Sequence, residues 1–379
     1  MKKLTSLPLI TLSLALYFTQ PVPARASDDG LAFKRAQHLQ HGINASIWFA
    51  QSPGNYSVER LRGFTTSDDI ALIHQLGFDH VRLSIDADPL LPWLRNPEVP
   101  TPFVTELDRV VKTMLDQQLA VIIDIHPEGH YKAELVKGTE GVEHFAGLWR
   151  ALAKHFAATD PTLVFFEIMN EPEQDDPYRW QGIESFVAEQ IRQSAPNHTI
   201  IAAGAHWSGL DDLMMLEPIA VPNVIYTFHD YEPFPFTHQG ATWTSPQVLP
   251  LRAVPYPSTP DAVQTNVNQE PTLAGQFWIE QYGLNRWDAQ RIDATLAFAE
   301  KWSDLHHAPV YCGEFGVLRD YVNPAMRAEW VHDMRVALEK HKIGWAMWDY
   351  QENFGVVTKK DGKTIPDPEI VNALGLKTQ

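Results

Sequence analysis

The chain has 379 residues, of which 44% are hydrophobic and 20% are charged, an ordinary composition for a globular protein with a large core. Its formal net charge is −17. An acidic surface of this kind argues against nucleic acids and anionic membranes as partners and is compatible with a neutral or cationic partner. Cys312 is the only cysteine, so an internal disulfide is excluded and a role in packing is expected.

The first residues are typical of a secretory signal peptide. Two lysines precede an apolar stretch over residues 7–18, and residues 24–26 (Ala-Arg-Ala) match the small-x-small cleavage pattern. An uncleaved membrane anchor is the alternative, but this stretch is shorter than the roughly 20 residues that a span needs. We therefore expect residues 1–26 to be removed. The mature chain, residues 27–379, is expected to be a single-domain monomer that is secreted or periplasmic and not bound to a membrane.

Eight short strand-like runs follow along the chain, separated by amphipathic helical patterns. The runs are residues 41–48, 80–86, 120–126, 163–170, 199–205, 223–231, 310–316 and 344–350. Eight alternations of strand and helix predict an α/β fold, namely a (β/α)8 (TIM) barrel in one domain. An open doubly wound sheet is the alternative, and it is disfavoured because the sequence has no glycine-rich phosphate turn.

The segments between the strands have helix signals. Residues 65–77 begin with potential N-cap threonines and end at a glycine, and residues 105–119 place their apolar side chains on one face. The segment after the fifth run, residues 208–218, allows only a short helix. The segment from residue 232 to about residue 286 interrupts the alternation of strands and helices. It is rich in proline, threonine and aromatic side chains, and it is too long for a simple loop between a strand and a helix. We expect an extended loop there, beside the functional end of the barrel, rather than a second domain.

In most of the predicted strands, polar side chains occupy every second position and apolar side chains occupy the positions between them. Because side chains in a strand alternate between its two faces, each set shares a face. The polar or unusual set consists of Asn44, Ser46, Trp48, Arg82, Ser84, Asp86, Asp124, His126, Glu167, Met169, Glu171, Thr227, His229, Tyr231, Cys312, Glu314, Ala346 and Trp348. We expect this set to line the barrel interior and to converge at the C-terminal rim, where barrel enzymes carry out their chemistry.

Two glutamates lie at the ends of opposing strands of the predicted barrel. Glu171 follows the fourth run and Glu314 ends the seventh, so their carboxyl groups can face one central pocket. A carboxyl pair across a pocket indicates glycoside hydrolysis, in which one group protonates the leaving oxygen and the other attacks the anomeric carbon. The competing interpretation is two ordinary polar residues near loops, since a motif as short as Asn-Glu-Pro matches by chance.

Further residues at the strand ends carry a resemblance to a known family. They are Arg82 in HVRLS, His126 in DIHPEGH, Asn170-Glu171-Pro172 in MNEPE, His229 and Tyr231 in FHDYEPF, Glu314 in CGEFG and Trp348 in MWDY. With these residues in this order, the chain resembles glycoside hydrolase family 5, a family of retaining β-glycanases with a (β/α)8 fold, over nearly the whole mature chain. The resemblance implies that Glu171 is the general acid/base and that Glu314 is the nucleophile.

The resemblance also implies which residues support the two carboxylates. Arg82 and Tyr231 are expected to hydrogen-bond Glu314 and to keep it ionised and aimed. Asn170 is expected to hold the 2-hydroxyl of the sugar. A retaining mechanism requires the two carboxyl groups to lie roughly 5–5.5 Å apart, so a separation near 9 Å would contradict this interpretation.

The sugar-binding surface is expected to include rings. The resemblance implies that His126 and His229 line the site of the cleaved sugar and that Trp348 stacks on the pyranose, whose apolar face an indole covers well. Trp243 is the best candidate for a further sugar subsite, because it closely follows the sixth strand. Weaker candidates, for which packing is at least as plausible, are Trp48, His206, Trp207, Trp278 and Trp287.

The three glutamates of residues 162–173 have different expected roles. Glu171 is the catalytic candidate, and Glu173 lies past the strand and should be solvated. Glu167 shares the inward parity, and a carboxylate inside a barrel needs partners. We therefore expect Glu167 to be buried and hydrogen-bonded, with Arg82 as a candidate donor.

The expected activity is the retaining cleavage of β-glycosidic bonds in a polysaccharide, most simply as an endo-β-1,4-glucanase (cellulase) without a metal or other cofactor. A metal site between His126 and His130 lacks the HExxH spacing, and no GxSxG elbow supports a serine esterase. The alternatives are other β-glycanases of the family (mannanase, licheninase, xyloglucanase, exo-glucosidase), a transglycosylase, and a non-catalytic polysaccharide-binding barrel.

Overall fold

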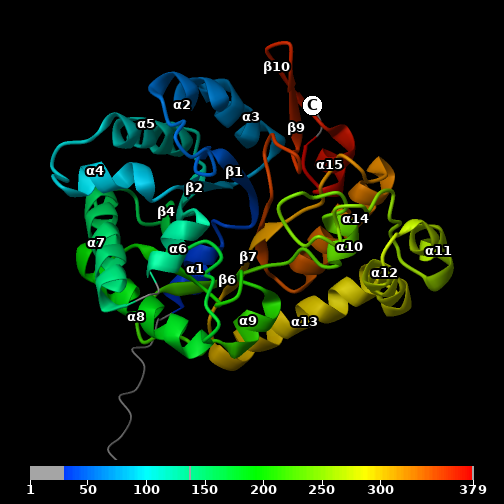
Figure 1. The fold of residues 1–379 in the computed structure, drawn as a ribbon. Helices are drawn as coiled ribbons and strands as arrows, with labels where there is room; N and C mark the ends of the chain where they lie inside the picture. Colours follow the sequence, from blue (N-terminus) through cyan, green and yellow to red (C-terminus); the bar gives the residue numbers. More distant parts are fainter. Residues whose placement is uncertain (1–29, 136–137, 378–379) are drawn as a thin grey trace, which may run out of the picture.

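The computed structural model describes residues 30–135 and 138–377 (Figure 1). Eight parallel strands close into a barrel in chain order, because β1 pairs with both β2 and β8. The strands are β1 (His41–Phe49), β2 (His80–Ile85), β3 (Ala120–Ile125), β4 (Val164–Glu167), β5 (Thr199–Ala203), β6 (Val224–His229), β7 (Val310–Phe315) and β8 (Gly344–Met347). The predicted (β/α)8 fold is confirmed.

Helices surround the strands (Figure 1). They are α1 (Leu31–Ala36), α2 (Val58–Phe64), α3 (Ser67–Leu76), the 3-10 helix η1 (Asp88–Leu90), α4 (Leu91–Leu94), α5 (Pro102–Asp116), α6 (Gly129–Leu135), α7 (Thr139–Phe156), α8 (Pro177–Ser194), α9 (Leu210–Met215), α13 (Ala289–His306) and α14 (Pro324–Lys340). Helix α9 is short, as its segment predicted.

The helix signals in the sequence correspond to observed caps. At the start of α3, Thr66 and Asp69 form a reciprocal capping box, in which each side chain accepts a hydrogen bond from the backbone of the other. The helix ends at Gly77, whose φ of 105° is a left-handed conformation that glycine adopts at low cost. Thr101 caps α5, and the predicted apolar face of α5 packs on the core.

The core has an inner and an outer layer. The inner cluster, at the N-terminal end of the barrel interior, consists of Leu39, Ala120, Ile122, Phe165, Ile201, Ile225, Tyr311 and Ala346. The outer cluster lies between the opposite faces of the strands and the helices. Along a strand from its N-terminal to its C-terminal end, the inward side chains therefore change from apolar to polar. Ile122 is followed by Asp124 in β3, and Phe165 is followed by Glu167 in β4.

The predicted parity is wrong at three positions. Cys312 and Met169 belong to the outer cluster, because the pairing of β7 shifts register after Cys312 and β4 ends at Glu167 before Met169 is reached. Trp48 is fully buried and donates its indole N–H to the Leu61 carbonyl. The register of β1 shifts beyond Ala45, and one irregular residue moves all later side chains to the other face.

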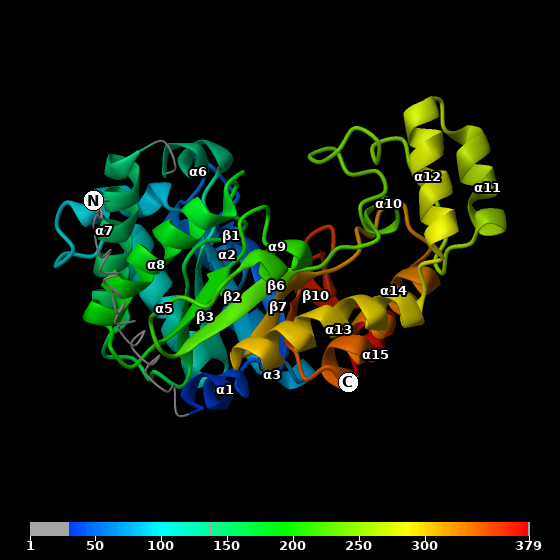
Figure 2. The ribbon, with the colours of Figure 1, turned by 90° about the horizontal axis from the view of Figure 1, so that it is seen from below.

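The insertion after β6 is partly helical, whereas an extended loop was expected. It contains α10 (Phe234–Thr237), α11 (Pro260–Gln269) and α12 (Leu273–Asn285). Figure 2 shows α11 and α12 side by side at one end of the molecule, away from the barrel strands. Helix α12 exposes apolar side chains such as Phe277 as well as burying others, so it lacks the one-sided apolar pattern that predicts a helix.

A C-terminal hairpin was also not predicted. Strands β9 (Val357–Lys360) and β10 (Lys363–Pro366) pair antiparallel and precede α15 (Pro368–Ala373). Lys359 and Thr364 of this hairpin both donate hydrogen bonds to the carboxylate of Asp69 at the start of α3. The hairpin therefore attaches the end of the chain to the outer helix layer.

No helix within the described ranges is long and apolar enough to cross a membrane. The predicted signal peptide, residues 1–26, lies outside the described residues.

Candidate active site

The two predicted catalytic carboxylates face each other at the C-terminal end of the barrel. One oxygen of Glu171, one oxygen of Glu314 and one ring nitrogen of His229 lie within 4.8 Å of one another. Nearest oxygens this close agree with the short carboxyl separation, roughly 5–5.5 Å, predicted for a retaining glycosidase.

Glu314 points inward because of an irregularity in β7. The β6–β7 pairing passes from Phe228–Cys312 directly to His229–Glu314, so one additional residue, Gly313, is accommodated in β7. A Cβ on Gly313 would lie 2.7 Å from Thr227 Oγ1 and 3.1 Å from His229 Nε2, so any larger residue there would force these side chains to shift.

Two donors bind the Glu314 carboxylate, as predicted. Arg82 Nη1 donates to Oε1 at 2.7 Å, and the Tyr231 hydroxyl donates to Oε2 at 2.8 Å. Each oxygen therefore has its own donor, and this orients the carboxylate plane towards the pocket.

Glu171 is placed by a turn rather than by a strand. Its φ of 44° lies in the left-handed region, which costs a non-glycine residue roughly 1–2 kcal/mol, and such strain is concentrated at functional sites. Its Oε1 lies 3.0 Å from His229 Nδ1, and 26% of its side chain is exposed. Burial is the main cause that raises the pKa of Glu171, which favours the protonated form that a general acid needs.

Arg82 is the centre of a buried charge network. Its guanidinium makes a bidentate pair with Glu167, at 2.8 and 2.7 Å, and lies 3.1 Å from Asp124 Oδ2. It also donates to the side-chain oxygens of Asn44 and Asn170, each at 3.0 Å. The prediction that Glu167 is buried and bound by Arg82 is confirmed.

Asn44 and Asp124 are parts of the site that sequence reasoning placed on the inward face without a role. Asn44 donates to the Gly313 carbonyl at 3.0 Å, so it connects Arg82 to the irregular segment of β7. Asp124 is fully buried, and this burial raises its pKa to about 6. The sequence placed both residues on the inward face of their strands, which was the one signal for their presence in the site. It did not reveal which inward residues contact Arg82.

His126 is held as a neutral ring. Burial lowers its pKa to about 3. Asn170 uses its carbonyl oxygen to accept from Arg82, so its amide nitrogen donates to His126 Nε2 at 3.1 Å. The proton of His126 therefore sits on Nδ1 and is donated to Asp124 Oδ2 at 3.0 Å. Trp348 stacks on this ring, with 5.7 Å between ring centroids.

His229 lies between the two carboxylates. Its Nδ1 is 3.0 Å from Glu171 Oε1 and 3.5 Å from Glu314 Oε2. Burial lowers its pKa to about 4, so the ring is neutral near pH 7. A neutral imidazole can exchange hydrogen bonds with either carboxyl group without placing a fixed charge between them.

Aromatic rings continue from the site towards the insertion. Tyr231 contacts His238 and Phe354, and both of these rings lie near Trp243. Trp243 is 57% exposed, so its indole face is available, as a sugar subsite would require. Its role as a subsite stays a prediction.

The other candidate tryptophans differ from one another. Trp207 is 58% exposed, and its backbone N–H donates to the carbonyl of Pro172, the neighbour of Glu171. Trp287 is buried and Trp278 packs against the core, so both have packing roles, as does Trp48.

The proposed absence of a metal stays a prediction. Glu171, His229 and Glu314 are close enough to hold a cation, but Arg82 and Tyr231 already donate to both oxygens of Glu314. The alternative pair does not converge, because His126 is held by Asp124 and Asn170 while His130 pairs with Asp88 at 3.2 Å.

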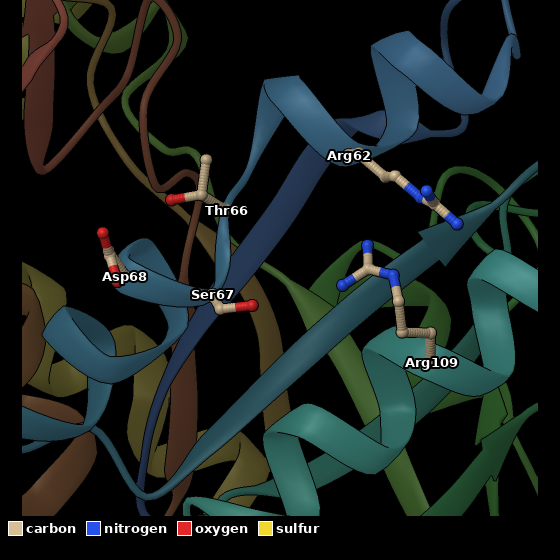
Figure 3. A pocket seen from close by; sticks show the side chains of 5 residues that line it. All are labelled: Arg62, Thr66, Ser67, Asp68 and Arg109. Atoms are coloured by element: carbon tan, nitrogen blue, oxygen red, sulfur yellow. The ribbon is translucent and has the colours of Figure 1, made fainter.

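A separate hollow of about 600 Å³ lies outside the barrel (Figure 3). It is lined by Arg62, Thr66, Ser67, Asp68 and Arg109, from the region of α2, α3 and α5. Both arginines bind the carboxylate of Glu106. This hollow contains none of the predicted site residues, so it is distinct from the candidate active site.

Comparisons with known proteins agree with the geometry. The family model "Cellulase (glycosyl hydrolase family 5)" matches residues 41–354. Endoglucanase C of Acetivibrio thermocellus is 28% identical over 340 residues, which cover 88% of this chain and 97% of that protein. Cellodextrinase A of Ruminococcus flavefaciens is 28% identical over 318 residues, which cover 82% of this chain and 84% of that protein.

A solved structure gives the same result. Cel5A of Thermotoga maritima in complex with cellobiose has a TM-score of 0.71 and 27% sequence identity, and the match covers 90% of this chain and 99% of that chain. Because the family model spans most of the sequence and the barrel carries the expected residues at its strand ends, the protein belongs to glycosyl hydrolase family 5.

Proposed function

We propose that this protein is an endo-β-1,4-glucanase that cleaves its substrate by a retaining double displacement. The observation that carries the proposal is the pair formed by Glu171 and Glu314, whose nearest oxygens lie within 4.8 Å. At this separation there is room for a sugar carbon between the carboxylates but not for an additional water molecule.

In the first step, a Glu314 oxygen attacks the anomeric carbon as the bond to the leaving sugar breaks. Glu171 donates its proton to the leaving oxygen, and a glycosyl ester on Glu314 forms. Arg82 and Tyr231 hold Glu314 in line for the attack. The raised pKa of Glu171 matches its role as the acid.

In the second step, water attacks the same carbon and the ester bond to Glu314 breaks. Glu171, now ionised, accepts the proton of that water and returns to its starting state. Asn170 has one amide hydrogen directed to His126, and its second is available for the 2-hydroxyl of the sugar. Trp348, stacked beside His126, offers the platform for the pyranose ring.

The β-1,4-glucan substrate is supported by the relatives, which carry the names endoglucanase and cellodextrinase. A neutral polysaccharide is also compatible with an acidic protein whose formal charge is −17. Because one relative is named cellodextrinase, exo-acting cleavage remains an alternative to endo-acting cleavage. Signal-peptide removal after residue 26, export to the periplasm or the medium, and a monomeric state are further parts of the proposal.

The test is a hydrolysis screen on carboxymethylcellulose, lichenan, xyloglucan and mannan with the wild type and Glu314→Gln. We expect reducing ends from carboxymethylcellulose and a fall of at least about 10³-fold in the variant, because the neutral amide cannot form the glycosyl ester. Activity on mannan alone would overturn the glucanase assignment, and full activity in Glu314→Gln would overturn the nucleophile.

Product analysis over time separates the remaining alternatives. Early accumulation of long oligosaccharides that exceed the substrate in length would identify a transglycosylase. Release of only cellobiose or glucose from chain ends would identify an exo-acting enzyme. Binding to glucan without turnover of any substrate in the wild type would identify a non-catalytic barrel.

A further inference from the structure

Lys132 is an unusually buried lysine beside the candidate active site. It lies on α6, directly after the β3 loop that carries His126, and only 8% of its side chain is exposed. Other lysines that pair with carboxylates keep 33–74% of their side chains exposed; they are Lys112, Lys154, Lys340 and Lys359. A buried ammonium is costly unless nearby negative charge compensates it.

The ion-pair partner of Lys132 belongs to the loop of the acid/base. Among the described residues its one such partner is Glu173, whose Oε1 lies 3.4 Å from the ammonium. Glu173 follows Glu171 by two positions, and 42% of its side chain is exposed. The prediction that Glu173 is solvated is therefore correct only in part, because this carboxylate also connects the β4 loop to α6.

The other charged groups around Glu171 have partners or are neutral. Arg82 is shared among three carboxylates, and the pKa values of His126 and His229, lowered by burial to about 3 and about 4, keep both rings neutral near pH 7. The titratable or charged groups that act on Glu171 from its surroundings are Arg82, Asp124, His126, Lys132, Glu173, His229, Tyr231 and Glu314. In this set Lys132 is the cation with one ion-pair partner among the described residues, Glu173, whereas Arg82 has three.

We propose that Lys132 and Glu173 form a pair of positioning residues that sets the pH range in which Glu171 holds its proton. The proposal rests on the proposed function, in which Glu171 is the acid/base. The positive charge of Lys132 favours the ionised form of Glu171, and the negative charge of Glu173 favours the protonated form. After burial, Lys132 is the largest influence on the pKa of Glu171 and lowers it, whereas Glu173 raises it.

The proposal predicts opposite effects for the two partners. Lys132→Met removes a cation, so Glu171 keeps its proton to higher pH and the alkaline limb of kcat/KM moves up by about one pH unit. Glu173→Gln removes an anion, so the same limb moves down by a smaller amount because Glu173 is more exposed. The double variant should lie between the two single variants.

A direct titration keeps this test independent of turnover. Protein labelled with ¹³C at glutamate carboxyls would be titrated by NMR, with Glu171→Gln identifying the resonance of Glu171. Lys132→Arg retains the charge and should titrate like the wild type. Lys112→Met, which removes an exposed lysine paired with Asp116, is the matched control and should also leave the Glu171 titration unchanged.

The possible outcomes distinguish a failure of the Lys132–Glu173 inference from a failure of the proposed glucanase function. Opposite shifts in Lys132→Met and Glu173→Gln, with no shift in Lys132→Arg, support the inference. A Glu171 titration that is unchanged in all variants overturns it, even if the wild type cleaves glucan. A raised KM in Lys132→Met without a shift also overturns it, because Lys132 would then bind substrate. A wild type that turns over no glycan overturns the proposed function, and the titration still tests the pair.

Discussion

The two ends of the barrel interior are built from the same strands but have opposite chemistry. At the N-terminal end, inward side chains such as Ile122 and Phe165 form an apolar cluster. Two residues later on the same strands, Asp124 and Glu167 gather around the guanidinium of Arg82. The apolar end gains stability from any close packing of about the right volume, whereas the charged end is stable only as a complete set. The apolar end therefore contributes to stability alone, whereas the charged end supports both the fold and the chemistry.

The largest expected effect comes from breaking the charged end. Arg82→Met leaves Glu167 and Asp124 buried without their cation, which should lower the free energy of unfolding by about 3–5 kcal/mol and abolish glucanase activity. Urea denaturation followed by circular dichroism measures the first quantity. Arg109→Met is the matched control: Arg109 is 34% exposed and Glu106 keeps its second arginine, Arg62, so the loss should be at most about 1 kcal/mol. An unchanged urea midpoint in Arg82→Met would show that the network does not support the fold.

A substitution at the apolar end should affect stability and leave chemistry intact. Ile122→Ala creates a cavity in the inner cluster and should cost about 3 kcal/mol of unfolding free energy. Well below the unfolding temperature, kcat and KM should equal those of the wild type, because the cavity lies below the network around Arg82. If kcat fell tenfold in a fully folded Ile122→Ala protein, the two ends would not be separable.

A third buried carboxyl group sharpens the comparison because it lacks a cation. Glu184 on α8 is fully buried, and among the described residues its one hydrogen bond comes from the Ala203 N–H at 2.7 Å. Burial raises its pKa to about 8, far above the ordinary value of about 4.3. The folded state therefore binds this proton more tightly than the unfolded state does. The resulting stability is complete below about pH 4.3 and is lost as the pH rises towards 8.

Glu184→Gln tests this sign. The amide stays neutral at every pH, so the variant does not lose stability as the pH rises. Its free energy of unfolding relative to that of the wild type should therefore increase between pH 5 and pH 8, by up to about 1.4 kcal/mol per pH unit. Urea unfolding at pH 5, 6.5 and 8 measures the difference. A difference that stays constant over this range would show that Glu184 is ionised in the folded state.

The sequence was most informative where its signals were local. Strand alternation placed Arg82, Glu167 and His229 correctly on the inward face, because these residues lie in regular stretches of β2, β4 and β6. The same rule failed for Cys312 and Trp48, because irregular pairing inverts the alternation and has no distinct composition. The helices of the insertion were missed because α12 has apolar residues on more than one side.

The sequence by itself determined the barrel, the family and the identity of the two candidate catalytic glutamates. These follow from periodicity and from short motifs, which depend on residues close together in the chain. Only the tertiary structure decided which groups meet. Arg82 and Glu314 are 232 positions apart in the sequence, and Lys132 and Glu173 are 41 positions apart. Such contacts depend on how the barrel closes and how its loops turn, and they set the proton positions and charges that single-residue patterns do not encode.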